Sequence, residues 1–176
     1  MSDDRIELLK HHIRDVPDFP KPGIVFKDIT PLLAEPRAFT ACLDLFAERF
    51  AGERVDAVVG IESRGFIFGA ALAARMTASF VPARKPGKLP AEVDRVEYEL
   101  EYGTDALEMH VDALARNERV VIVDDLIATG GTAAATVALC ARRGATVLGC
   151  AFVVELGFLN GTAKLGDTPV LSLITY

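Results

Sequence analysis

Hydrophobic residues recur along this chain at two different spacings, and their alternation predicts the order of helices and strands. One apolar set with the three- and four-residue spacing of a helix face runs from Phe39 to Phe50 and ends near Gly52. Short, continuous apolar runs are typical of strands buried on both faces, and they cover residues 55–60, 79–83, 120–123 and 146–154. Helices are predicted between them at residues 66–74 and 133–143. The repeated strand–helix–strand order predicts an α/β fold with a parallel sheet covered by helices on both faces.

Two segments depart from this alternation. Ile6, Leu9 and Ile13 lie at helical spacing and predict a short N-terminal helix, which the prolines from Pro17 onward end. Between residues 93 and 110, apolar residues alternate with glutamates and Gly103 begins a turn, which predicts an inserted antiparallel hairpin. Its acidic face suits an edge hairpin that resists aggregation, or a mobile flap that closes over a reactive centre and excludes water.

Composition narrows the class of protein. With 176 residues, of which 51% are hydrophobic, the chain can bury a sizeable core, and we expect one domain covering residues 1–176. A net charge of −6 argues against a general nucleic-acid or anionic-membrane surface. The sequence has no leading basic-plus-apolar segment and no apolar run long enough to span a bilayer, so we expect a cytoplasmic protein.

Cysteine and histidine are used sparingly. The three cysteines lack CxxC spacing and lie in apolar surroundings, which predicts reduced core residues: Cys42, Cys140 and Cys150. The three histidines are scattered and do not predict a zinc site: His11, His12 and His110.

The segment with the most specific chemistry is residues 120–132, VVIVDDLIATGGT. Asp124 and Asp125 follow the predicted strand at its carboxyl end, where ligands of open α/β sheets bind. The residues after them are small or carry hydroxyls, so that backbone N–H groups can approach an anion: Ala128, Thr129, Gly130, Gly131 and Thr132. The following helix would point the positive end of its dipole at the same place.

The carboxylates of Asp124 and Asp125 indicate what kind of anion would bind at this loop. They would repel a phosphate, so they more plausibly accept hydrogen bonds from sugar hydroxyls or metal-bound water, and the ligand suggested is a ribose phosphate. The chain has neither a Walker-type loop with its lysine nor a GxGxxG run after a strand. The alternative is an ordinary strand-to-helix turn in which Asp and Thr side chains merely cap the helix.

This segment resembles the phosphoribosyl-diphosphate (PRPP) motif of type I phosphoribosyltransferases. Four further segments resemble the adenine phosphoribosyltransferase family in the same order, and they cover residues 18–29, 60–66, 84–90 and 100–103. The similarity runs from about Ile6 to Tyr176. It implies the type I phosphoribosyltransferase fold, a hood formed by about residues 1–35 plus the C-terminal segment, and a flap at about 84–110. It also implies the reaction of adenine with PRPP to give AMP and pyrophosphate, the cofactor Mg²⁺, and a homodimer.

Two loops are candidates for the pyrophosphate site. Ser63 follows a predicted strand and can present its backbone N–H, while Arg64 offers a bidentate fork. Arg84, Lys85 and Lys88 lie in a Pro/Gly-bounded loop that could neutralise a departing anion, and in the family this loop lies near the dimer interface. The plainer alternatives are that Arg64 pairs with a surface carboxylate and that the basic residues only keep a loop tip solvated.

The base site follows mainly from the resemblance. Phe26 lies in a Pro/Gly-punctuated loop and could stack on a purine, although an isolated Phe is more often a core residue. The resemblance implies that backbone groups near Val25 and Lys27 read the edge of adenine and that Leu156 packs on its other face. Relatives often have arginine at position 27, a change that a backbone reader tolerates.

The resemblance implies catalytic roles for two residues of the flap. Glu101 would act as the proton-transfer group, and Tyr102 would either hydrogen-bond at the reaction centre or anchor the hairpin. Mg²⁺ would be carried mainly by PRPP, with any contact to Asp124 or Asp125 through water. Open alternatives are a transferase for a 6-oxopurine or orotate, and a PRPP-sensing regulator that binds without turnover, although a regulator needs a DNA-binding module.

Overall fold

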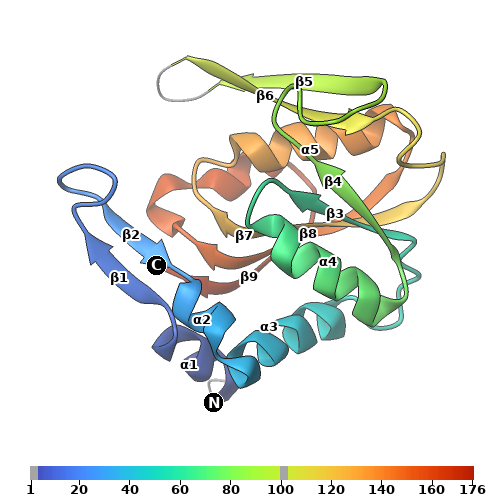
Figure 1. Cartoon of the computed structure of the whole chain (residues 1–176). Helices are drawn as coiled ribbons and strands as arrows, with labels where there is room; N and C mark the ends of the chain where they lie inside the picture. Colours follow the sequence, from blue (N-terminus) through green and yellow to red (C-terminus); the bar gives the residue numbers. More distant parts are fainter. Residues whose placement is uncertain (1–3, 100–102) are drawn as a thin grey trace.

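The computed structural model describes residues 4–99 and 103–176. Its centre is a five-stranded sheet in which every neighbouring pair of strands is parallel (Figure 1). The strands in spatial order are β4 (Ser79–Ala83), β3 (Ala57–Ile61), β7 (Arg119–Ile127), β8 (Thr146–Glu155) and β9 (Val170–Thr175). The parallel sheet predicted from the apolar runs is therefore confirmed.

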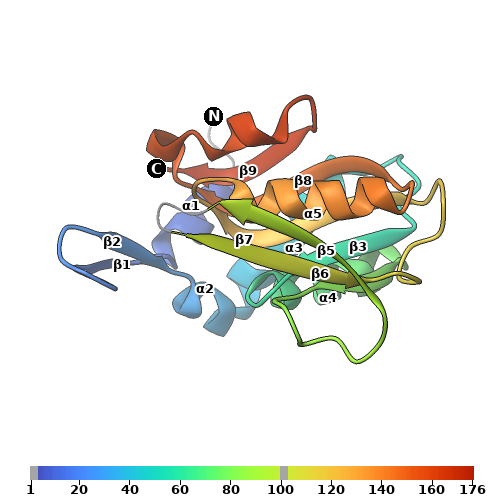
Figure 2. The same cartoon turned by 90° about the horizontal axis from the view of Figure 1, so that it is seen from above.

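Helices cover the two faces of the sheet unequally (Figure 2). One face packs against α1 (Asp4–His11), α3 (Pro36–Arg49) and α4 (Gly65–Met76). The other packs against α5 (Gly131–Arg142) and a hairpin. In β7, Val121 and Val123 join the first core and Val120 and Ile122 the second, which explains why the run of residues 120–123 is apolar at every position.

The hairpin lies where the alternating pattern predicts it. Strand β5 (Val93–Glu99) pairs antiparallel with β6 (Thr104–His110). Both strands pack on α5. Glu101 and Tyr102 lie outside the described residues.

Several short elements are absent from the sequence-based prediction. Strands β1 (Arg14–Pro17) and β2 (Val25–Asp28) form a separate antiparallel hairpin, followed by the five-residue helix α2 (Thr30–Ala34). Two 3₁₀ segments, Gly157–Leu159 and Gly161–Leu165, connect β8 to β9. Strand β9 of the central sheet was not predicted either. Each of these elements is only three to six residues long, too short for a periodic pattern to be distinguished from a loop.

All three cysteines are fully buried, so we expect them to be unreactive in the folded protein. Burial raises the pKa of the Cys140 and Cys150 thiols to about 12, and it also raises the pKa of the Cys42 thiol. Because the thiolate is the nucleophile, such a shift lowers reactivity at neutral pH by about a thousandfold relative to a free thiol. A disulfide reagent should therefore modify these cysteines only after denaturation. Rapid modification of the native protein would contradict this.

No helix among residues 4–99 and 103–176 is long and apolar enough to cross a membrane.

Candidate functional site

The phosphate loop, residues 128–132, connects the end of β7 to the start of α5. Strand β7 continues to Ile127, four residues beyond the predicted end, because β8 pairs with it as far as Glu155. The two aspartates therefore lie within the strand and not after it. Helix α5 begins at Gly131, two residues earlier than predicted, and Gly130 precedes it with a φ of 77° that favours glycine.

A pocket of about 110 Å³ opens at this loop. It is lined by Asp124, Leu126, Ile127, Ala128, Thr129, Gly130, Thr132, Ala133 and Phe152. No side chain of the described residues caps the N-terminus of α5, so the interpretation of the segment as a capped turn fails. Uncapped N–H groups and the positive dipole end of a twelve-residue helix are features that suit an anion.

Gly161 supports the phosphate loop from behind, and the sequence analysis gave it no role. A Cβ atom on Gly161 would lie 2.1 Å from the Ala128 carbonyl oxygen, and one on Gly130 would lie 2.0 Å from the Gly161 carbonyl oxygen. Two backbone segments 31 residues apart in sequence thus approach without room for a side chain on either glycine. In the sequence, Asn160-Gly161 reads as an ordinary turn.

The two aspartates have different environments. Asp125 is 3% exposed and Asp124 is partly buried. Burial, and then the neighbouring charge of Asp125, raise the pKa of the Asp124 carboxyl well above its usual value. The Asp125 backbone N–H donates to Asp124 Oδ1 at 2.8 Å. A cationic or hydroxyl-rich ligand would relieve this crowding of negative charge.

Arg64 connects the aspartates to the predicted base site. Its Nε lies 2.9 Å from Asp125 Oδ2, in an ion pair whose geometry is not that of a hydrogen bond, so this oxygen lacks a hydrogen-bond partner in the described part of the chain. Its guanidinium carbon lies 5.3 Å from the centre of the Phe26 ring. Arg64 does pair with a carboxylate, but the partner is buried in the cleft and does not lie on the surface.

A larger cleft of about 450 Å³ adjoins these residues. It is lined by Glu62, Ser63, Arg64, Lys85, Asp124, Asp125, Leu126 and Thr132. Asp124, Leu126 and Thr132 also line the phosphate-loop pocket. The structure therefore places the two predicted anion sites next to each other, and Asp124 lines both pockets.

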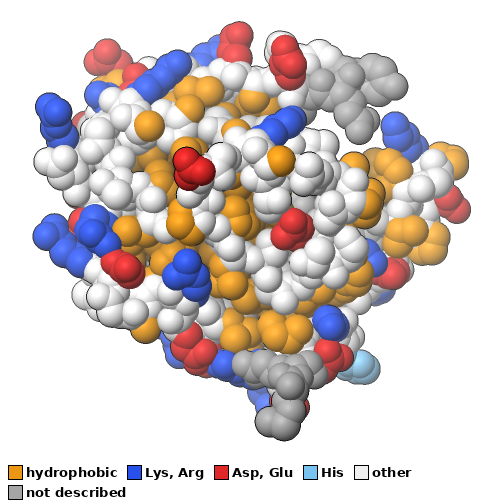
Figure 3. Space-filling view, turned by 180° about the vertical axis from the view of Figure 1, so that it is seen from behind, with side chains coloured by type: hydrophobic (Ala, Val, Ile, Leu, Met, Phe, Trp, Pro, Cys, Tyr) orange, Lys and Arg blue, Asp and Glu red, His pale blue; other side chains and the backbone are white. Residues whose placement is uncertain are grey.

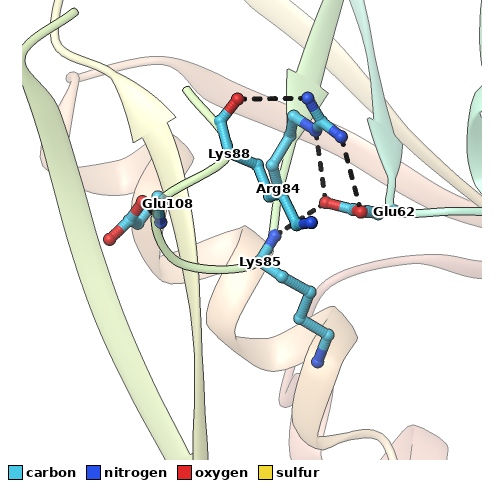
Figure 4. A network of polar contacts seen from close by, with 6 residues as sticks. Glu62, Arg84, Lys85, Lys88 and Glu108 are labelled. Carbon is cyan, nitrogen blue, oxygen red and sulfur yellow. Dashed lines mark hydrogen bonds and ion pairs between the residues drawn. The ribbon is translucent and has the colours of Figure 1, made fainter. Parts of the chain in front are cut away.

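The basic loop, residues 84–90, is held in place by two acidic residues that the sequence analysis did not single out (Figure 4). Glu62 accepts hydrogen bonds from Arg84 Nε at 3.2 Å and from the Lys85 backbone N–H at 2.9 Å. Glu108 accepts one from the Gly87 backbone N–H at 2.9 Å. Burial raises the pKa of the Glu62 carboxyl, but the hydrogen bonds from Lys85 and Arg84 outweigh it and lower that pKa overall.

Within the basic loop the three cations differ. Arg84 also donates to the Lys88 carbonyl oxygen at 3.1 Å, so its guanidinium braces the loop. Lys88 is exposed. Lys85 lines the cleft, and its ammonium group donates to Tyr98 Oη at 2.6 Å and contacts Asp105, both on the β5–β6 hairpin. Burial lowers the pKa of Lys85, but the bonds to these two residues raise it overall, so Lys85 stays charged.

The residues predicted for the base site lie in strand β2 and directly after β8. Phe26 is only partly buried, which argues against a purely core role, and its ring lies 5.2 Å from that of Phe19 in an edge-on contact. Val25 is 48% exposed. Leu156 directly follows β8, and its N–H donates to the Ile127 carbonyl oxygen at 3.0 Å, beside the phosphate loop.

Comparison with known proteins identifies this arrangement. A phosphoribosyl transferase domain model matches residues 28–167. The adenine phosphoribosyltransferase of Sorangium cellulosum is 61% identical over 99% of this chain and 90% of its own. The crystal structure of the Rhodothermus marinus adenine phosphoribosyltransferase is 50% identical, with a TM-score of 0.94, and the match covers 98% of this chain and 99% of that one.

A third relative was crystallised with ligands. The Saccharomyces cerevisiae adenine phosphoribosyltransferase, complexed with an imino-altritol bisphosphate and adenine, is 42% identical with a TM-score of 0.93, and the match covers 97% of this chain and 99% of that one. A phosphate loop, paired aspartates and an inserted hairpin on a five-stranded parallel sheet thus occur together with high identity over nearly the whole chain. The chain belongs to the adenine phosphoribosyltransferase family, within the type I phosphoribosyltransferases.

Proposed function

We propose that this chain transfers the phosphoribosyl group of PRPP to adenine and releases AMP and pyrophosphate. The supporting observation is the pair of pockets that share Asp124, Leu126 and Thr132. A molecule with a phosphate at one end and a diphosphate at the other, joined by a diol, fits this order of anion site, carboxylates and cationic cleft. The full-length relatives, all named for adenine, support the choice of base.

In this proposal each part of the cleft acts on one part of the substrate. Backbone N–H groups of residues 128–132 hold the 5′-phosphate, and the aspartates accept hydrogen bonds from the ribose hydroxyls. As the bond from C1 to the pyrophosphate oxygen breaks and the bond from C1 to adenine N9 forms, Lys85 and the loop containing Ser63 and Arg64 stabilise the departing anion.

The base and its proton complete the scheme. Phe26 and Leu156 would hold the two faces of adenine, and backbone groups of Val25 and Lys27 would read its edge. Adenine gives up a proton as N9 reacts, and we propose Glu101 as the acceptor, with Tyr102 beside it on the flap. The roles of Glu101 and Tyr102 rest on the family resemblance.

The carboxylates in the described part of the chain suit a Mg²⁺ ion that binds together with PRPP. The described residues include no cluster of three or more potential metal ligands, but Asp125 has a buried carboxylate oxygen without a hydrogen-bond partner. Asp124 and Asp125 could hold the water shell of an ion that PRPP carries. When bound, Mg²⁺ would supply charge neutralisation for the phosphate oxygens. We also propose a cytoplasmic homodimer in which Lys88 and the basic loop lie near the partner subunit.

A direct assay tests the proposed function. Adenine, hypoxanthine, guanine and orotate are each supplied with PRPP and Mg²⁺, and nucleotide formation is followed by chromatography. We expect AMP from adenine and far slower reaction of the other bases. The exocyclic amine of adenine donates a hydrogen bond where the carbonyl of a 6-oxopurine accepts one, so backbone groups in fixed positions cannot bind both. Preference for another base would overturn the proposed specificity.

The surface charge offers no specific support for a nucleic-acid-binding regulator. Acidic and basic side chains are interspersed on the face seen in Figure 3, and no single-sign field dominates it. PRPP binding without consumption of any base, together with salt-sensitive DNA binding, would favour that alternative.

The Asp125→Asn substitution is expected to weaken PRPP binding. It keeps the side-chain shape but removes a buried charge that faces both the diol site and Arg64. Removing one partner of a buried charged contact costs about 2–5 kcal/mol, so KM for PRPP should rise at least about thirtyfold. The exposed Asp167→Asn is the control, with unchanged KM. A wild-type KM for PRPP in Asp125→Asn would refute the assigned role.

A further inference from the structure

Tyr176 contacts both walls of the proposed base site, although its own ring belongs to neither. On one side, Lys27 Nζ lies 3.6 Å from the centre of the Tyr176 ring. On the other, the Tyr176 N–H donates to the Glu155 carbonyl oxygen at 2.9 Å, and its carbonyl oxygen accepts from the Gly157 N–H at 3.0 Å. Figure 1 shows the C-terminus beside β2.

The first wall is the strand that carries Phe26. Lys27 follows Phe26 in β2, and its side chain is only 10% exposed, although it carries a charge. The ammonium group is held between the Tyr176 ring and Asp15, whose Oδ1 lies 2.7 Å away. The Lys27 side chain therefore anchors β2 to Tyr176 and to Asp15.

The second wall is Leu156. Glu155 and Gly157 flank it, and both bond to the backbone of Tyr176. The position of Leu156 is thus fixed by the same residue whose ring holds Lys27.

The contact between Tyr176 and Lys27 links the β1–β2 hairpin to the segment that carries Leu156. Among residues 4–99 and 103–176 the two strands of the hairpin pair only with each other and lie outside the five-stranded sheet, so strand pairing with the sheet does not set the hairpin's distance from Leu156. We propose that Tyr176 is a positioning residue for base binding, which sets the gap between Phe26 and Leu156 by holding Lys27. This inference rests on the proposed function, because the gap has this meaning only if a purine fills it.

Substitutions that remove the contact should affect adenine and spare PRPP. Tyr176→Leu removes the ring but keeps the backbone bonds, and Lys27→Met removes the charge at similar side-chain length. A partly desolvated cation–π contact corresponds to about a tenfold change in affinity, so each variant should raise KM for adenine about tenfold. KM for PRPP should stay at the wild-type value. The double variant should be no worse than either single variant, because both remove the same contact.

Conservative and matched variants separate positioning from general damage. Tyr176→Phe and Lys27→Arg keep a ring and a cation, and they should recover most of the adenine affinity. Lys10→Met removes a lysine that pairs with Glu7 at 3.0 Å within helix α1 and not with a residue of the proposed base site, so it should leave both KM values unchanged. Thermal melting of each variant establishes that it folds, and Lys27→Met carries the test if Tyr176→Leu does not fold.

The outcomes distinguish the two proposals. If the wild-type protein does not convert adenine, the proposed function fails. If it does, but Tyr176→Leu and Lys27→Met keep the wild-type KM for adenine or raise both KM values equally, the positioning role of Tyr176 is wrong and the proposed function stands. A selective and non-additive rise in KM for adenine supports the role.

Discussion

Gly161→Ala is expected to lower kcat/KM for PRPP by about a hundredfold or more, although Gly161 would not touch the substrate. The new Cβ would lie 2.1 Å from the Ala128 carbonyl oxygen and 2.8 Å from the Gly130 nitrogen. Real Cβ atoms do not approach so closely, and both neighbours are backbone atoms that cannot rotate away. The phosphate loop must therefore shift, and a displacement of about 1 Å at a substrate-positioning group can cost a hundredfold in rate.

Steady-state kinetics and calorimetric binding of AMP measure this effect. AMP lacks the pyrophosphate, so weaker AMP binding places the defect at the 5′-phosphate. Gly52→Ala is the control, because Gly52 has a φ of 88° but open space around the new Cβ. That variant should lose some stability through backbone strain and keep its kinetics. Wild-type AMP affinity in Gly161→Ala would show that the close glycine contact does not shape the phosphate loop.

Glu101→Gln is expected to lower kcat by about 10²–10⁴, the usual range for loss of a general acid or base. The substitution keeps the size and hydrogen-bonding ability of the side chain but removes its capacity to take a proton. Binding of PRPP should be little affected, because the aspartates and the phosphate loop are unchanged. The expected signature is a lower kcat with a wild-type KM for PRPP.

The flap provides a matched control for Glu101. Glu99 precedes it by two residues in the same alternating pattern, lies at the end of β5 and is exposed. Glu99→Gln removes a similar charge and should leave kcat unchanged. If Glu99→Gln shows an equal loss, the effect is electrostatic and not specific to Glu101. A wild-type kcat in Glu101→Gln would require another proton acceptor.

The sequence by itself determined four of the five strands of the central sheet, and it predicted a phosphate loop at residues 128–132. Continuous apolar runs such as residues 120–123 are required when a strand is buried on both faces, so they predict their own environment. The hairpin at residues 93–110 was also predictable from the sequence, because the alternation of apolar and polar residues is a local property of a strand. The phosphate loop followed from residue types that are contiguous in the chain.

Only the tertiary structure decided which partner each charged side chain of the cleft contacts. Arg84 and Lys85 are neighbours in one basic loop, yet Glu62 engages the Arg84 side chain while Tyr98 and Asp105 of the hairpin engage the Lys85 ammonium group. Gly161 and Tyr176 acquire their roles only through backbone segments distant in the sequence. No local pattern encodes these contacts, because they depend on where separate strands and loops end relative to one another once the sheet has formed.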